Sequence, residues 1–572
     1  MRQSHPSMHY SVYGAAPLAS LGKTRASDVD KCRRRIAFLA CLCAFAFACI
    51  AVRAVQVGAF AASGAKRSPS PAAQGYGRMT VLDRGGKRVA VNLATESLYA
   101  NPRKMIEKNE AARRIAAVLP SVSQEELRAA FAKDRAFVWI KRHLTPKERN
   151  DVNLLGIPGV YFQADARRIY PHNALFSHTI GYVDVDGKGL AGIERYFNDV
   201  LTHPSDPDQT MTLAQEVAVQ HATRSALADA IEKYKALSGA ALVTDVTTGE
   251  VLALAGLPDF DPNVPGRATE KQRFNVASLG VYEPGSVFKI FTAAMGLEEG
   301  TIHMKQKVDV TRPLRIGRYA IRDFHQSRKP FDLEEIMMES SNIGAAKIAL
   351  ESTADTQRTF LRSLGLFEKV SIELPERGEP LLPPEHWGKI HQATVAFGHG
   401  MAVTPLHLAK AVGAMVNGGY LKPLTLLKVE GRPPEGKRVI SKDTSDKIRR
   451  LMRLTVAYGT GKNANVPHYL VGGKTGTADK AKAGGYSSNS VIASFLGVFP
   501  MNAPKYLIYV MLDDPHIDVG RPTGGRVAAP AAYEIIRRIA PVLGVPPANE
   551  DDEDVREQFW YDLDKPGHGS RA

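Results

Sequence analysis

The sequence predicts an α+β protein in which several domains follow one membrane-spanning helix. With 572 residues, the chain is too long for a single ordinary domain. Residues 36–52 form an uncharged, mainly apolar run, and beyond it helical patterns alternate with strand-like runs suited to antiparallel pairing. These observations predict five parts: a cytoplasmic tail (1–35), a transmembrane helix (36–57), a linker and pedestal domain (58–208), a large C-terminal domain (209–546) and a disordered acidic tail (547–572).

The residues that flank the apolar run predict its orientation. Lys31 and the arginines at 33–35 precede it, so the positive-inside rule keeps the N-terminus in the cytoplasm and exports the rest. Arg53 follows the run, and its long side chain can reach the outer interface. A cleaved signal peptide is the alternative, because Ala59-Phe60-Ala61 is a small-x-small site, but such peptides have shorter apolar segments of about 7 to 15 residues.

Composition limits the remaining possibilities. The net charge is +15, but the basic residues lie in short scattered groups without interleaved aromatics, so no nucleic-acid partner is predicted. Two interpretations of this charge stay open: attraction to anionic lipid or an acidic wall polymer, or a solvated basic surface. All four cysteines, at 32, 41, 43 and 49, lie in or beside the apolar run, so the exported part can form no disulfide. The sequence has no metal-ligand motif and no phosphate-binding glycine loop, so no cofactor is expected.

The segment between the anchor and residue 208 is expected to be a linker followed by a mixed α/β pedestal. Residues 61–77 are rich in Ala, Ser, Pro and Gly, as linkers are. From residue 78 onward, strand-like pieces such as 88–93 alternate with helical ones such as 123–133. Because this region contains no catalytic constellation, we interpret it as a stalk or docking domain.

The C-terminal part has clear signals for both helices and strands. Residues 217–236 are helical in pattern, and 240–245 with 250–254 predict a hairpin. Thr404 is an N-cap residue followed by proline, so a helix is expected to begin there. The acidic run 550–554 predicts a disordered end of the chain.

The motif Ser286-x-x-Lys289 carries the main functional signal. It places a hydroxyl and an amine almost one helical turn apart, so the two side chains share a face. A neutral amine is one of the few bases that can activate an alcohol as a nucleophile. Pro284 and Gly285 precede an apolar helical run, so Ser286 is expected at a helix N-terminus, where N–H groups favour negative charge. The pattern alone is weak, because the chain repeats it at Ser20-x-x-Lys23 and Ser63-x-x-Lys66.

Two further motifs follow in order. The first is Ser340-Ser341-Asn342, and the second is Lys474-Thr475-Gly476-Thr477, which begins a predicted strand. The runs 491–499 and 506–512 would continue from it as successive antiparallel strands, and Gly476 would let a substrate backbone lie close. Ser487-Ser488-Asn489 repeats the first of these motifs, but it comes after the second and lies in a polar stretch that we interpret as a loop.

On these residues, the chain resembles the class B penicillin-binding proteins, most closely the FtsI-type division transpeptidases. The order Ser-x-x-Lys, Ser-x-Asn, Lys-Thr-Gly is that of penicillin-interacting enzymes. Two departures are Met79, where the family usually has glycine, and a short join around residues 210–217. The resemblance runs from the anchor to about residue 545 and includes Asp83-Arg84-Gly85-Gly86, Arg167-Arg168-Ile169-Tyr170-Pro171, Gly192-Ile193-Glu194, and the segments 245–253 and 397–406.

The resemblance implies a mainly antiparallel sheet flanked by helices, and a role for each motif residue. Ser286 would attack the D-Ala-D-Ala bond of a stem peptide, with Lys289 as its base and Ser340 as a proton relay. Asn342 would orient Lys289, and the backbone N–H groups of Ser286 and Thr477 would form an oxyanion hole. Burial and repulsion between the two lysines are expected to keep Lys289 neutral. The terminal carboxylate would be received by Lys474, Thr475 and Thr477.

The resemblance also implies partners and a location. These are D-Ala-D-Ala stem peptides, β-lactam antibiotics, a SEDS-family glycosyltransferase and other division proteins, at the inner membrane with the catalytic domain in the periplasm. Ala40, Ala44 and Ala48 would form a small-residue face on the anchor that meets a polytopic partner or simply faces lipid. Three alternatives stay open: an elongation-type transpeptidase, a D,D-carboxypeptidase or β-lactamase, and a non-enzymatic β-lactam sensor or division scaffold.

Overall fold

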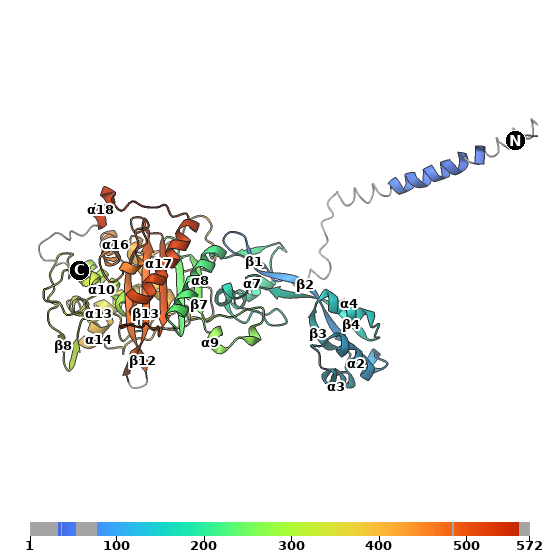
Figure 1. The fold of residues 1–572 in the computed structure, drawn as a ribbon, viewed down its shortest axis with the longest axis horizontal. Coiled ribbons are helices and arrows are strands. Elements are labelled where there is room, and N and C mark those ends of the chain that lie inside the picture. Colours follow the sequence, from blue (N-terminus) through green and yellow to red (C-terminus); the bar gives the residue numbers. More distant parts are fainter. Residues whose placement is uncertain (1–32, 36, 53–76, 207, 483–484, 560–572) are drawn as a thin grey trace, which may run out of the picture. The chain divides into compact units, whose positions relative to one another are not determined.

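The protein is described by a computed structural model (Figure 1), which covers residues 33–35, 37–52, 77–206, 208–482 and 485–559. The helix Arg33–Val52 has a mean hydropathy of 2.4 and is the one helix in these ranges that is long and apolar enough to cross a membrane. This finding supports the predicted anchor. Almost all of the predicted tail (1–35) and linker (61–77) lies outside the described residues.

The pedestal is built on a five-stranded sheet. Its long strand β2 (Arg88–Ala100) pairs antiparallel with β4 (Val160–Ile169) along most of its length. The helices α2 (Lys108–Val118) and α3 (Gln124–Ala132) enclose a core with this sheet, in which Phe131 is fully buried. The predicted strand at 88–93 and helix at 123–133 are therefore confirmed. The other strands of the sheet are β1 (Thr80–Leu82), β3 (Val138–Leu144) and β5 (Thr210–Thr212), the last of which extends it past residue 208.

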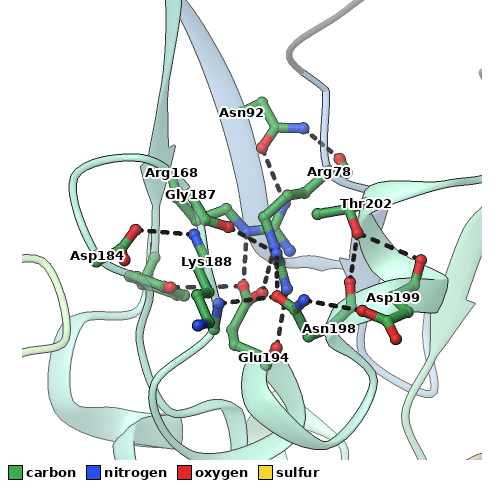
Figure 2. Close-up of polar contacts among 12 residues, drawn as sticks. Arg78, Asn92, Arg168, Asp184, Gly187, Lys188, Glu194, Asn198, Asp199 and Thr202 are labelled. Carbon is green, nitrogen blue, oxygen red and sulfur yellow. Dashed lines mark hydrogen bonds and ion pairs between the residues drawn. The ribbon is translucent and has the colours of Figure 1, made fainter.

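A buried ion cluster joins three distant segments of the pedestal (Figure 2). The side chain of Glu194 is fully buried and accepts hydrogen bonds from Nε of Arg78 at 2.8 Å and from Nε of Arg168 at 2.6 Å. Arg168 also donates to Oδ1 of Asn92, and Arg78 donates to Oδ1 of Asn198. The cluster thus ties the start of the pedestal at Arg78 to the later motifs around Arg168 and Glu194. Removing one partner would be costly, because it would leave a buried charge uncompensated.

The C-terminal domain contains a five-stranded antiparallel sheet with the order β12-β13-β14-β6-β7. The hairpin of β6 (Ser238–Asp245) and β7 (Val251–Leu257) joins the late strands because β6 pairs with β14 (Tyr506–Asp513). The edge of the sheet is formed by β12 (Gly472–Lys482), which pairs with β13 (Gly485–Phe499). The predicted hairpin and the predicted antiparallel strands are confirmed.

Helices cover both faces of this sheet, because alternate residues of its central strands point to opposite sides. Ile508 packs in a cluster with α8 (Val217–Lys233) and α17 (Gly524–Val542). Leu507 belongs to the cluster on the other face, with α10 (Lys289–Glu298). That second layer also contains α15 (Pro405–Val416) and α16 (Lys442–Ala457).

Shorter elements connect these layers. In the pedestal and the join they are η1 (Pro102–Lys104), α4 (Pro146–Leu154), η2 (Asn173–Phe176), α5 (Ser177–Ile180), α6 (Gly192–Tyr196) and α7 (Asn198–Thr202). In the C-terminal domain they are η3 (Pro265–Arg267), α9 (Glu270–Arg273), η4 (Gly285–Phe288), β8 (Leu314–Ile316), β9 (Tyr319–Ile321), α11 (Leu333–Met338), α12 (Asn342–Leu350), α13 (Ala354–Ser363), α14 (Lys389–Val395), β10 (Tyr420–Leu421), β11 (Lys437–Arg438), η5 (Lys462–Ala464) and α18 (Glu553–Phe559).

The prediction of a disordered tail from residue 547 is wrong up to residue 559. There α18 buries Val555 and Phe559, which lie one turn apart just after the acidic run 550–554. Arg453 of α16 pairs with Glu550 at 3.0 Å, so one of the charges that suggested disorder is compensated. Residues 560–572 lie outside the described residues.

The interpretation of Ser487-Ser488-Asn489 as a loop is also wrong. These residues lie within β13, where Ser487 pairs with Lys480 of β12, so backbone pairing overrides the local composition. Met79, where glycine is usual, is buried in a hydrophobic cluster with Leu201, and its N–H donates to the carbonyl oxygen of Leu201, so it causes no break. The helix expected after Thr404 is confirmed, since Thr404 caps α15.

Candidate active site

The first motif lies at the start of a helix, as its sequence predicts. Pro284 lies just before η4, which begins at Gly285, and α10 continues directly from Lys289. Gly285 has a positive φ of 54°, which turns the chain at this point. Ser286 is half-buried, whereas the side chain of Lys289 is almost completely buried beneath it. The amine of Lys289 donates to Oγ of Ser286 at 3.0 Å, so the two groups are in hydrogen-bond contact.

The second motif contributes three oxygens to the same amine. Nζ of Lys289 lies 2.7 Å from Oδ1 of Asn342, 2.5 Å from the carbonyl oxygen of Ser340 and 3.1 Å from its Oγ. Ser340 has a positive φ of 59°, a strained conformation for a residue other than glycine. This backbone turns both the carbonyl and the hydroxyl of Ser340 toward the amine, which explains why the strain is tolerated.

The third motif approaches Ser340 from the sheet. The side chain of Lys474 is fully buried, and its Nζ donates to Oγ of Ser340 at 2.8 Å. Thr475 and Thr477 alternate along β12 and both line the cleft beside Ser286. Ser340 therefore lies between the two lysines. The structure brings together all eight residues that the sequence singled out: Ser286, Lys289, Ser340, Asn342, Lys474, Thr475, Gly476 and Thr477.

The site lowers the proton affinity of both lysines. Burial holds the pKa of Lys289 well below its usual value, and the nearby charge of Lys474 lowers it further, while Asp323 opposes the shift. Burial also lowers the pKa of Lys474, to about 7. The arrangement thus favours a neutral amine beside Ser286, as the sequence predicts.

The role expected for Gly476 needs correction. A Cβ at this position would lie 2.8 Å from the carbonyl oxygen of Pro284 and 2.4 Å from Oγ of Ser494. The missing side chain therefore lets the turn before Ser286 pack against β12, so the space belongs to the protein itself and not to a substrate backbone.

The motifs open onto a cleft of about 1000 Å³. Ser286, Ser340, Asn342, Thr475 and Thr477 line it, whereas the two lysines lie behind them. In the part of the chain that the structure describes, there is no cluster of three or more His, Cys, Asp or Glu side chains that could hold a metal ion. The cleft can hold an extended peptide whose reactive carbonyl lies against Ser286.

Sequence reasoning missed two residues that support the site. Asp323 accepts hydrogen bonds from the backbone N–H of Asn342 at 2.5 Å and from Oγ of Ser341 at 2.6 Å, and it thereby fixes the start of α12. The hydroxyl of Thr460 lies 2.9 Å from that of Thr475. Neither residue belongs to a local pattern, because each reaches its partner only through the tertiary fold.

Comparisons with known proteins agree with this geometry. The penicillin binding protein transpeptidase domain family matches residues 239–537, and the penicillin-binding protein dimerisation domain family matches residues 75–222. A probable peptidoglycan D,D-transpeptidase FtsI of Caulobacter vibrioides is 40% identical over 483 residues, which is 82% of each chain. A probable peptidoglycan D,D-transpeptidase PenA of Neisseria gonorrhoeae is 33% identical and covers 90% of this chain and 93% of its own.

A solved structure supports the fold in addition. A peptidoglycan synthetase from Bifidobacterium adolescentis superposes with a TM-score of 0.67 at 24% identity, over 84% of this chain and 98% of its own. At that level of identity the likeness concerns the fold alone. It extends over both the pedestal and the domain that carries the cleft.

Proposed function

Because the chain belongs to the class B penicillin-binding proteins of the FtsI type, we propose that it cross-links peptidoglycan stem peptides as a D,D-transpeptidase through an acyl-enzyme on Ser286. The observation that carries the proposal is the position of one buried amine. Nζ of Lys289 contacts Oγ of Ser286, Oγ of Ser340 and Oδ1 of Asn342 within 3.1 Å. A nucleophile, its base and a proton relay are thereby within hydrogen-bond reach of one another.

In the first half of the reaction, Oγ of Ser286 transfers its proton to the neutral amine of Lys289 and attacks the carbonyl carbon of the penultimate D-Ala. The backbone N–H groups of Ser286 and Thr477 stabilise the oxyanion. The C–N bond then breaks, and the proton held by Lys289 passes through Ser340 to the departing D-Ala amine. Asn342 lies 2.7 Å from Nζ of Lys289 and orients the base.

In the second half, an amine from a neighbouring stem peptide attacks the ester carbon. The ester C–O bond breaks as the new amide forms, and the proton lost by the attacking amine passes through Lys289 to Oγ of Ser286. Before acylation, Thr475 and Thr477 bind the terminal carboxylate of the donor, and the charge of Lys474 behind them attracts it. A β-lactam enters the same site because its ring amide resembles the scissile bond.

The test is turnover of a stem pentapeptide by the purified full-length protein, with and without an acceptor amine. Cross-linked product that appears only with the acceptor, and not in Ser286→Ala, supports the transpeptidase. Release of the acyl group to water as the only product would instead assign a carboxypeptidase or β-lactamase. Binding of penicillin without any peptide turnover would favour a sensor or scaffold.

For the cellular role, the proposal is septal wall synthesis by a single-pass inner-membrane protein with the cleft in the periplasm. The relatives named FtsI and the apolar helix Arg33–Val52 support it. A SEDS-family glycosyltransferase would supply the glycan strands and contact the anchor through the face of Ala40, Ala44 and Ala48. Depletion should give cells that elongate without septa, whereas swollen, rounded cells would assign the protein to elongation.

A further inference from the structure

One ion pair lies on the wall of the cleft beyond the three motifs. Asp479 follows Thr477 by two residues on β12, so both side chains point to the cleft side of the strand. There Asp479 accepts a hydrogen bond from Nη2 of Arg521, a residue of the loop before α17. The pair therefore joins the edge strand to the loop before α17, which also lines the cleft.

This pair keeps unused binding capacity. The two side chains are 30% and 36% exposed, so a ligand can reach both. A guanidinium carries five N–H donors, and the hydrogen bond to Asp479 uses one on Nη2. The exposed end of the guanidinium can therefore donate to an acceptor in the cleft while it stays beside Asp479.

The charges around the pair indicate what it can bind. The cleft lining contains four Arg or Lys side chains, at 322, 462, 521 and 526, but two carboxylates, Glu339 and Asp479. The excess of cations favours a substrate with more than one carboxylate. Asp479 adds a local acceptor for a cation immediately beside Arg521.

The position along β12 indicates which part of the substrate reaches the pair. In the described sheet β12 has a neighbouring strand on one side, so its other side is available to an extended peptide. With the scissile carbonyl held at Thr477, the residue before D-Ala-D-Ala lies one step, about 3.3 Å, further along the strand, whereas Asp479 lies two steps, about 7 Å, from Thr477. A long side chain on that residue spans the remaining distance to Asp479.

We propose that Asp479 and Arg521 recognise the zwitterionic end of a long side chain on the donor peptide, at the residue that precedes D-Ala-D-Ala. Asp479 binds the ammonium of that side chain, and Arg521 binds its carboxylate as a fork. The pair is thus a specificity determinant for side chains that end in an amino acid group. The inference rests on the proposed function, because the donor must lie along β12.

The test compares three peptides N-acetyl-X-D-Ala-D-Ala, with X as 2,6-diaminopimelate, its side-chain carboxamide or lysine. The full-length protein should prefer the free carboxylate by about 10- to 100-fold in kcat/KM, the range expected for one charge-assisted hydrogen-bond pair. Arg521→Gln should abolish this preference and leave the rates on the carboxamide and lysine peptides unchanged. Lys480→Gln is the matched control, because Lys480 is on the same strand but is not part of the cleft lining. Its Nζ pairs instead with Oδ1 of Asp513 at 2.6 Å.

The outcomes separate the inference from the function on which it rests. Equal losses on all three peptides in Arg521→Gln, or loss of its penicillin acylation, would show that the pair only holds the loop and would overturn the inference. Absence of a carboxylate preference in the wild-type protein would overturn it as well. No turnover of any peptide by the wild-type protein would overturn the proposed function itself.

Discussion

Replacing Gly398 by alanine should displace Ser286 although no side chain of the site is changed. Gly398 has a φ of +81°, and a Cβ there would lie 2.2 Å from the carbonyl oxygen of Gly285, with two further backbone atoms of Gly285 within 2.8 Å. Backbone atoms cannot rotate away as a flexible side chain can. The turn that carries Ser286 must therefore move.

The size of this movement determines the expected effect. Contacts of a real Cβ are ordinary from 3.4 Å upward, so the backbone of Gly285 has to retreat by about 1 Å. A misplacement of about 1 Å at a reacting atom can cost about 100-fold in rate. We therefore expect penicillin acylation of Gly398→Ala to be about 100-fold slower, measured by rapid mixing with a fluorescent penicillin on the full-length protein.

Gly400→Ala is the matched control. Gly400 lies in the same loop with a φ of +79°, but a Cβ there would meet only Oγ1 of Thr394 at 3.8 Å. The left-handed backbone should cost each variant about 1–2 kcal/mol of stability, measured by thermal unfolding, and Gly398→Ala should lose more because of its backbone clash. Acylation of Gly398→Ala as fast as that of Gly400→Ala would show that the turn before Ser286 is not displaced.

Three other perturbations test the role of Lys474, the choice between the two Ser-Ser-Asn copies and the buried ion cluster of the pedestal. Because burial lowers the pKa of Lys474 to about 7 and a lysine is charged only below its pKa, acylation should weaken as the pH rises through that value. Lys474→Arg should remove this loss from the pH profile, and an unchanged profile would contradict the role. Asn342→Ala should slow acylation about 100- to 10,000-fold in the same assay, whereas Asn489→Ala should not, and equal losses would contradict the choice between the two motif copies. Glu194→Gln should lower the free energy of unfolding by about 3–5 kcal/mol in urea titrations with Ser286 still labelled, because two buried arginines lose their counter-charge. A loss below about 1 kcal/mol would show that the cluster is not needed for stability.

Much of the candidate site could be predicted because its chemistry depends on particular residue types at short spacing. Ser286 and Lys289 lie on one face at the start of a helix, and Pro284 with the following apolar run marks that start. Thr404 likewise indicates the start of α15, because its side chain caps the helix and a proline follows it. Signals of this kind involve residues within one helical turn, so they can be detected in a single amino-acid sequence.

Residues that act through the tertiary fold could not be predicted in this way. Asp323 reaches Asn342, and Arg521 reaches Asp479, from loops that no local pattern connects to the motifs. The same limit explains the wrong prediction for the tail, where the composition suggested disorder. Its helix docks by burying Val555 and Phe559, and Arg453 on α16 compensates Glu550 just before it.

The most direct test of the central claim is to locate the penicillin adduct on the full-length protein by peptide mapping and mass spectrometry. We expect one labelled peptide, the one that contains Ser286. We also expect no label on Ser286→Ala, a variant that should unfold at the same temperature as the wild-type protein. A label on another serine, or one that persists in the folded Ser286→Ala variant, would show that Ser286 is not the nucleophile.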